Sequence, residues 1–115
     1  MRPVVTPAQV AYAVDLVHRV HCSSVLVEYV LDLVAATRSH PELTVGASPR
    51  ASVGLVRAAQ AHAVVSGRSH VTPDDVQAVI VPALAHRVSV GGNVDTSAGA
   101  EVIGTIVRSV AVPRP

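Results

Sequence analysis

Apolar residues along this chain recur every three to four positions, which is the spacing of one face of an α-helix. The first apolar stripe follows Thr6 and consists of Val10, Val14, Val17 and Val20. The second runs from about Ser24 to Thr37 and consists of Leu26, Tyr29, Val30, Leu33 and Val34. Each stripe predicts an amphipathic helix with one face buried against a partner.

Three hydroxyl–proline pairs mark predicted helix starts: Thr6-Pro7, Ser48-Pro49 and Thr72-Pro73. A hydroxyl can cap the free amides of a first turn, and proline fits the first helical position without losing an internal hydrogen bond. The pair at Ser48 predicts a third helix that ends at Gly67, a residue suited to a left-handed terminator. The pair at Thr72 is followed by Asp75 at capping-box spacing, which predicts a fourth helix.

Two segments interrupt the helical pattern, residues 38–47 and residues 89–100, and both are rich in loop-forming residues. Pro82 is expected to kink the fourth helix or end it early. A last helix is predicted from the apolar residues Val102 to Val110, and Pro113 is expected to stop it. Because valine is abundant, isolated strands near 43–45 or 87–90 remain an alternative. The predicted class is all-α: a compact bundle of four to five short helices forming a single domain over residues 1–115.

Composition adds three expectations about the surroundings of the protein. No apolar run approaches the roughly 18 residues of a membrane span, so we expect no transmembrane helix. The first residues contain no apolar stretch of signal-peptide length. A single cysteine, Cys22, cannot form an internal disulfide, which agrees with a reducing compartment. We therefore expect a cytoplasmic protein.

The nine basic residues are all arginines, and they face eight acidic residues, so the formal net charge is +1. This balance gives no excess of positive charge for binding the phosphate backbone of nucleic acid. The absence of lysine also excludes a P-loop, whose lysine reaches the nucleotide phosphates. No apolar strand ends in Asp-Glu, so the usual magnesium and water-activating carboxylates are missing too. The chain alone should not be an NTPase.

The most informative segment for function is Gly46-Ala47-Ser48-Pro49-Arg50-Ala51. If Ser48 caps the third helix, Arg50 lies in its first turn, where the helix dipole disfavours a cation. An anion would reverse that conflict, because free amides and a guanidinium together bind a phosphate oxygen well. An ordinary solvated arginine would give the same local pattern.

A longer set of motifs resembles the C-terminal lid of MoxR-type AAA+ ATPases. In chain order these are Tyr29-Val30, Ala36-Thr37-Arg38-Ser39-His40-Pro41, Gly46-Ala47-Ser48-Pro49-Arg50-Ala51, Gly67-Arg68, Val71-Thr72-Pro73-Asp74-Asp75-Val76 and Leu84-Ala85-His86-Arg87. The resemblance extends from about residue 5 to Pro113. It departs from the family at Ser69-His70, where an acid and an aromatic are usual, and at Gly54 within the third helix.

The resemblance implies that Arg50 is the sensor-two arginine, which reaches from the lid to the γ-phosphate of ATP, with Ser48 and Pro49 as the supporting helix cap. It implies that ATP and Mg²⁺ are held by a nucleotide-binding core domain that is absent from this chain. The chain is then an excised domain, a split gene product or a degenerate paralogue, and the sequence does not choose among these. It further implies a homo-oligomeric ring, a chaperone-like activity on client complexes, and frequent von Willebrand A-domain partners. His86 and Arg87 are candidates for a subunit contact.

Other candidate sites are weaker. His18, His21 and Cys22 are close in sequence, and His18 and His21 are expected to share a helical face. No second cluster completes a four-ligand metal site, so no metal is expected. Arg38 near a helix end is explained by the helix dipole. Ser48 with His40 lacks the nucleophile elbow and third member of a hydrolase triad.

The alternative to a lid is a nucleic-acid-binding or protein-interaction module of histone-like or helix-turn-helix type, since Thr72-Pro73-Asp74-Asp75-Val76 also resembles the last helix of histone folds. A DNA binder should concentrate its arginines on one face. The arginines of this chain are scattered singly instead.

Overall fold

The computed structural model describes residues 3–91 and 96–114, and within these ranges the chain is helical. The elements in chain order are α1 (Pro7–Arg19), α2 (Ser24–Ser39), α3 (Ala51–Val65), α4 (Pro73–Leu84), the short 3₁₀ helix η1 (Ala85–Arg87) and α5 (Thr96–Ser109). Two isolated β-bridges, and no longer β-structure, occur in these ranges. The predicted all-α bundle is therefore confirmed.

Two of the three predicted helix starts have the expected capping geometry. At Thr6 the hydroxyl accepts a hydrogen bond from the amide of Gln9 (3.1 Å), and the amide of Thr6 donates to Gln9 Oε1 (2.8 Å). At Thr72 the backbone amide donates to Asp75 Oδ2 (2.8 Å). These reciprocal bonds satisfy donors that a helix start leaves free, so both starts are set by local sequence.

Helix ends differ more from the prediction. Helix α4 continues through Pro82 to Leu84 and then tightens into η1. Helix α5 begins at Thr96, inside the predicted connection of residues 89–100, of which residues 92–95 lie outside the described part. Gly99 lies in its first turns, where a Cβ would come within 3.1 Å of the Ala85 carbonyl oxygen. Close packing of α5 on η1 thus outweighs the low helix propensity of glycine.

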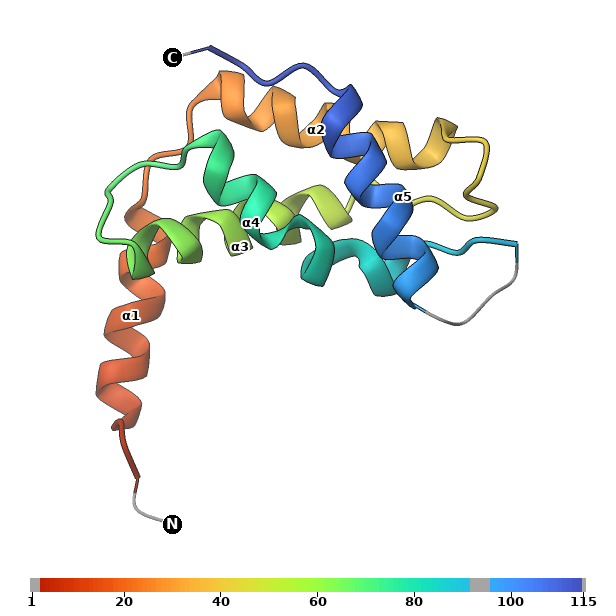
Figure 1. Cartoon of the computed structure of the whole chain (residues 1–115). Coiled ribbons are helices and arrows are strands. Elements are labelled where there is room, and N and C mark those ends of the chain that lie inside the picture. The colour runs from red at the N-terminus through yellow and green to blue at the C-terminus, as the bar shows by residue number, and fades with distance from the viewer. Residues whose placement is uncertain (1–2, 92–95, 115) are drawn as a thin grey trace.

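Helices α3 and α4 form the most extensive pair and carry much of the core. The face of α3 toward its neighbours is lined by small residues, among them the fully buried Ala59 and Ala63. Val76 and Ile80 of α4 are fully buried as well. Alanine on one helix lets branched side chains of the other approach its backbone closely, as the alanine-rich sequence predicts. Figure 1 shows α5 crossing over α2 and α4, which closes the bundle.

Helix α1 is the exception, because it projects away from the other four helices (Figure 1). Among the helices that the structure describes, its main contact is with α3, and it contains no buried residue. Among the described helices, none is long and apolar enough to cross a membrane.

Candidate functional site

The loop that leads to Arg50 is fastened to the end of α2 by two consecutive residues. Thr37 Oγ1 accepts a hydrogen bond from the Ala47 amide (2.9 Å) and donates one to the Val34 carbonyl (2.6 Å). Arg38 Nη1 donates to the Ala47 carbonyl oxygen (3.2 Å). Thr37 and Ala47 are fully buried, so these bonds form in a low-dielectric environment, where they hold the loop firmly. We call these residues the Thr37–Ala47 clamp.

Gly46 completes the clamp by allowing the loop backbone to lie directly on α2. A Cβ at this position would lie 2.5 Å from the Thr37 carbonyl oxygen and 2.6 Å from Arg38 Cα, both backbone atoms. No rotamer change can relieve such a contact, so the backbone would have to move. The glycine of the Gly-Ala-Ser-Pro-Arg motif is therefore explained by close approach.

Gly46→Ala is expected to lower the free energy of unfolding by about 2–3 kcal/mol, at the upper end of the usual cost of overpacking. The matched control is Gly54→Ala, because Gly54 lies within α3 and a Cβ there would meet nothing within 4 Å. That variant should raise stability by roughly 0.5–1 kcal/mol through helix propensity. Chemical denaturation of the three proteins measures both effects, and equal stabilities of Gly46→Ala and wild type would contradict the clamp.

Arg50 lies at the end of the clamped loop with its side chain exposed. Its guanidinium makes neither a hydrogen bond nor an ion pair with any part of the chain that the structure describes. An internal ion pair would have disqualified it as a residue for an external anion. The structure instead leaves the charge available.

The predicted role of Ser48 as a helix cap is wrong. Helix α3 begins at Ala51, the N-cap position belongs to Arg50, and no side chain caps it. The amide of Ala51, which a capping serine would bind through its hydroxyl, donates instead to the Ser48 carbonyl oxygen (2.9 Å). Pro49 therefore lies in a tight turn that precedes the α-helix rather than in its first turn.

The same turn changes the predicted anion site. The next two amides, those of Ser52 and Val53, also donate backward over three residues, to the carbonyls of Pro49 (3.1 Å) and Arg50 (3.1 Å). These amides are not free to bind a phosphate as the sequence predicted. Any anion at this end of α3 would have to be held chiefly by the Arg50 guanidinium.

A groove of about 390 Å³ opens between α2 and α3, and it reaches Pro49, the residue before Arg50 in sequence. Its lining includes Pro49, Ser52 and Val56 and is mostly apolar. Ser52 is buried, and its hydroxyl oxygen has no hydrogen-bond partner among the described residues. The arginine that lines this groove is Arg57, and Arg50 is not part of the lining.

The second candidate pair, His86 and Arg87, belongs to η1, and both side chains are exposed. An isolated antiparallel bridge joins Val45 to Ser89, with the Ser89 amide donating to the Val45 carbonyl oxygen (2.9 Å). This bridge lies where isolated strands were the alternative in the sequence. It holds the loop before Arg50 beside the segment after Arg87, so both candidate sites belong to one end of the bundle.

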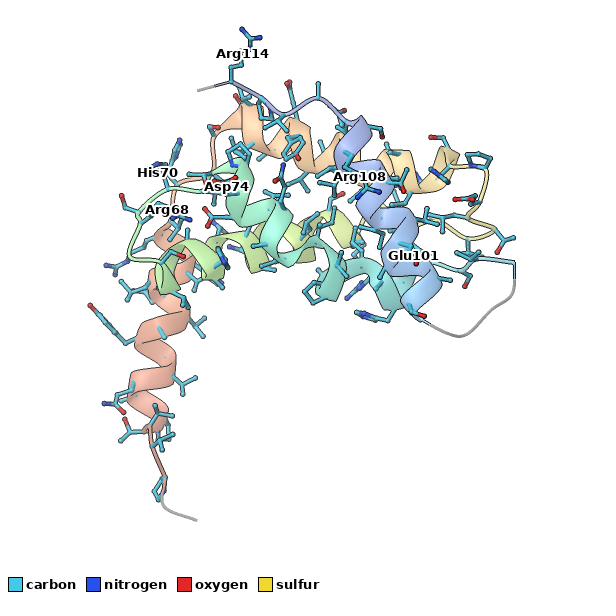
Figure 2. All side chains as sticks on the ribbon, in the orientation of Figure 1. Arg68, His70, Asp74, Glu101, Arg108 and Arg114 are labelled. Atoms are coloured by element: carbon cyan, nitrogen blue, oxygen red, sulfur yellow. The ribbon has the colours of Figure 1, made fainter. Side chains whose placement is uncertain are left out.

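A buried charge cluster at the start of α4 was not predicted. The Asp75 side chain is fully buried and accepts hydrogen bonds from His62 Nδ1 (2.7 Å), from Arg68 and from the Thr72 hydroxyl (3.1 Å). Arg68 lies in the loop between α3 and α4, near the exposed Asp74 in Figure 2. The Asp75 carboxylate therefore ties α3, this loop and α4 together.

Burial alone would raise the pKa of Asp75. The hydrogen bonds from His62 and Thr72, together with the positive charge of Arg68, outweigh burial and leave the pKa of this carboxyl below its ordinary value. Because the folded-state pKa is lowered, the ionised carboxylate stabilises the fold fully above the unfolded pKa of about 3.9, and this contribution is lost as pH falls through the folded pKa.

The melting temperature should therefore stay level from pH 7 to about pH 5 and fall steeply below about pH 4. In Asp75→Asn, which cannot ionise, the acid-side fall should be smaller and the melting temperature near neutral pH lower. Thermal unfolding followed by circular dichroism across this range measures both. Parallel pH curves for the two proteins would show that Asp75 is not the responsible group.

The remaining candidates are separated by the structure. Helix α1 ends at Arg19, so His18 and His21 do not share a helical face, and His21 pairs with His70 in a parallel bridge. Burial raises the pKa of the Cys22 thiol, which disfavours its thiolate form. Among residues 3–91 and 96–114, no three His, Cys, Asp or Glu side chains are grouped to hold a metal ion.

His40 and Arg38 have local structural roles. The ring nitrogen Nδ1 of His40 accepts a hydrogen bond from the Glu42 amide (3.2 Å), which shapes the turn after α2. Arg38 belongs to the clamp, in agreement with its predicted structural role. Neither residue forms a catalytic pair with Ser48 in the described contacts.

Comparison with known proteins identifies the family. The model of the AAA lid domain matches residues 35–108, which include the clamp, Arg50, α3, α4 and most of α5. The chaperone MoxR1 of Mycobacterium tuberculosis is 38% identical over 100 residues, covering 77% of this chain and 26% of MoxR1. Protein YeaC of Bacillus subtilis is 35% identical over 88 residues, covering 76% of this chain and 28% of YeaC.

A solved structure is similar as well. The crystal structure of a protein from Cytophaga hutchinsonii, proposed to be an ATPase, is 30% identical with a TM-score of 0.75, over 87% of this chain and 34% of that one. This chain thus spans only about a quarter to a third of the relatives that it matches. It belongs to the AAA lid domain family and is a helical lid of the MoxR type of AAA+ ATPase.

Proposed function

We propose that this lid presents Arg50 to the terminal phosphate of ATP bound by a nucleotide-binding core domain of the same parent protein. The observation that carries the proposal is an exposed, unpaired guanidinium at the end of a loop that the Thr37–Ala47 clamp fixes. Because the clamp fixes the loop, the long Arg50 side chain can reach a phosphate without the entropy cost of ordering that loop. If Arg50 were an ordinary solvated arginine, its exposure would be explained, but the Thr37–Ala47 clamp on the loop before it would not.

In this mechanism the Arg50 guanidinium donates hydrogen bonds to oxygens of the terminal phosphate, where charge builds during phosphoryl transfer. The bond exists only while that phosphate is attached, so its loss after hydrolysis changes the angle of the lid on the core. The described residues of this chain include no group of carboxylates that could hold Mg²⁺. The core domain would have to hold that ion and activate the attacking water.

The wider activity follows from the relatives only as a proposal. MoxR1 is called a chaperone, and on this basis we assign the parent a chaperone-like, cytoplasmic ATPase role. We further assign it a homo-oligomeric ring with von Willebrand A-domain partners. The exposed pair His86–Arg87, which the Val45–Ser89 bridge places at the Arg50 end of the bundle, is the candidate for contact with a neighbouring subunit.

A fusion protein tests the assignment. In it, residues 1–115 replace the matching segment of MoxR1, so the core comes from that relative and the lid from this chain. The isolated chain should show no ATP hydrolysis, because it has no lysine for a P-loop, whereas the fusion should hydrolyse ATP. Hydrolysis by the isolated chain, or a folded fusion without turnover, would contradict the proposed function.

A further inference from the structure

Two connecting segments of the chain lie side by side at the base of α1. They are the α1–α2 connector, residues 20–23, and the α3–α4 loop, residues 66–72 (Figure 1). The His21 amide donates to the Ser69 carbonyl oxygen (3.0 Å), and the Val71 amide donates to the His21 carbonyl oxygen (2.8 Å). These two bonds make His21 and His70 partners in a parallel β-bridge.

The bridge places two imidazole groups next to each other. Bridge partners direct their side chains to the same side of the paired backbones, which lie about 4.7–4.9 Å apart. Two histidines on such a pair can each point a ring nitrogen at one common position. Both residues are exposed, and both line one hollow of about 480 Å³. The rings therefore start side by side at the edge of an open space.

The fold does not require histidine at either position. The hydrogen bonds of the bridge are made by backbone atoms, which almost any residue supplies. Neither imidazole makes a hydrogen bond or an ion pair with any part of the chain that the structure describes. The ring nitrogens of both residues are therefore available to an external ligand.

The backbone is fixed on both sides of His21. Before it, the buried Gln60 of α3 donates from Nε2 to the Val20 carbonyl oxygen (2.9 Å). After it, the Ser23 hydroxyl caps α2 by accepting from the Leu26 amide (3.3 Å). The His21 side chain thus projects from a segment that has little freedom to move.

The buried Asp75 carboxylate fixes the backbone on both sides of His70. Arg68 donates to this carboxylate from one side of His70, and the Thr72 amide donates to it from the other (2.8 Å). Two ligands on fixed segments lose little conformational entropy when one ion binds both of them, which favours binding.

The charges near the pair do not oppose a cation strongly. The arginines closest to the bridge in sequence, Arg19 and Arg68, are both ion-paired with aspartates. Arg114 also lines the hollow, but Figure 2 shows its side chain directed outward and apart from that of His70.

We propose that His21 and His70 together bind one divalent transition-metal ion of the kind that imidazole prefers, such as Zn²⁺. Among the described residues, no third His, Cys, Asp or Glu side chain joins them, so water would complete the coordination. The site is thus an open two-histidine site and not the four-ligand site that the sequence excluded. The bound ion would join the α1–α2 connector to the α3–α4 loop and hold the base of α1 on the domain.

Calorimetric titration of the chain with ZnCl₂ tests the proposal, and we expect one Zn²⁺ per chain. His21→Ala and His70→Ala should each lower the affinity at least tenfold, because the second of two linked ligands binds at a high effective concentration. The matched control is His18→Ala, which removes an exposed histidine of α1 and should leave the affinity unchanged. Mg²⁺, which prefers oxygen ligands, should not bind this pair.

Nuclear magnetic resonance of the imidazole groups identifies the ligands directly. Of the six histidines in the chain, only His21 and His70 should show ring signals that shift as Zn²⁺ is added. The melting temperature of each variant without Zn²⁺ should match that of wild type, because the backbone bonds of the bridge remain. That measurement separates loss of a ligand from loss of the fold.

Loss of binding in His18→Ala but not in His70→Ala would overturn the proposal in favour of a site within one short segment. One ion per two chains would overturn it in favour of an ion held between two copies. Absence of saturable binding by wild type, or wild-type affinity in both His21→Ala and His70→Ala, would overturn it as well. None of these results depends on Arg50 or on a core domain, so they leave the proposed function untouched.

Discussion

Arg50→Ala in the fusion protein is expected to reduce the rate of ATP hydrolysis by about 100-fold. Removing one preorganised donor to a transition-state oxygen costs roughly 10²–10³ in rate in well-studied enzymes, and arginines that act on transferred phosphates are worth more. We expect the lower figure because, in the proposed mechanism, the lid would have to close before Arg50 contacts the nucleotide. Steady-state turnover at saturating ATP measures the effect.

The matched control for this variant is Arg108→Ala. Arg108 is an exposed arginine on α5 whose Nη2 donates to Thr105 Oγ1 (3.2 Å) within the same helix. Figure 2 shows it on the outside of α5. Its removal lowers the net charge by the same amount but should leave turnover within about twofold, because a solvated surface charge contributes little at a distance. Equal losses in the two variants would mean that net charge is the cause.

Asp75→Ala should lower the free energy of unfolding of the isolated chain by about 3–5 kcal/mol, the usual cost of breaking a buried ion pair from one side. The substitution leaves His62 and Arg68 without their shared acceptor and frees the Thr72 amide. A domain of this size has only about 5–15 kcal/mol of net stability. We therefore expect a partly unfolded protein at 37 °C, which thermal and urea denaturation would detect.

Asp74→Ala provides the comparison for this variant. Asp74 occupies the same first turn of α4 but is exposed and contributes only through the helix dipole, about 0.3–1 kcal/mol. A large difference between the two aspartates would assign the effect to the buried cluster. Similar losses would show that both residues act through the dipole and that the cluster adds nothing.

The features that could be predicted from the sequence depend on residues close together in the chain. The capping boxes at Thr6 and Thr72 join residues three positions apart, and both helix starts were predicted correctly. The left-handed Gly67 after α3 was recognised in the same way, and it has φ of 78°. Ser48 has the same hydroxyl–proline pair as these two caps. In the structure, however, the Ala51 amide donates to the backbone carbonyl of Ser48 in the turn through Pro49 and not to a side-chain hydroxyl. The hydroxyl–proline pair does not distinguish these two turns.

The parts of the site that could not be predicted join residues distant in sequence. Thr37 and Ala47 are ten residues apart, and nothing in either segment indicates that one binds the backbone of the other. Asp75 was predicted as the capping-box partner of Thr72, but its bond to His62 was not predicted, because His62 belongs to another helix. The one available signal was that His62 directly precedes Ala63 on the alanine-rich face of α3, where a polar residue needs a partner.

Helix α1 shows the limit of hydrophobic periodicity. The stripe from Val10 to Val17 correctly predicted a helix, and it also predicted that one face is buried. In the described structure Val10 and Val14 of that face are exposed, and only Val17, nearer the rest of the domain, is partly buried. Periodicity indicates that a face needs a partner but not which molecule or domain supplies it.

The central claim is that Arg50 distinguishes ATP from ADP by contacting the terminal phosphate. The most direct measurement is the ratio of the ATP and ADP dissociation constants of the fusion protein, determined by calorimetry with wild type and with Arg50→Ala. We predict that Arg50→Ala lowers the preference for ATP over ADP at least tenfold, while the affinity for ADP stays the same. If the ratio of the two dissociation constants is the same in Arg50→Ala as in wild type, Arg50 does not contact the terminal phosphate.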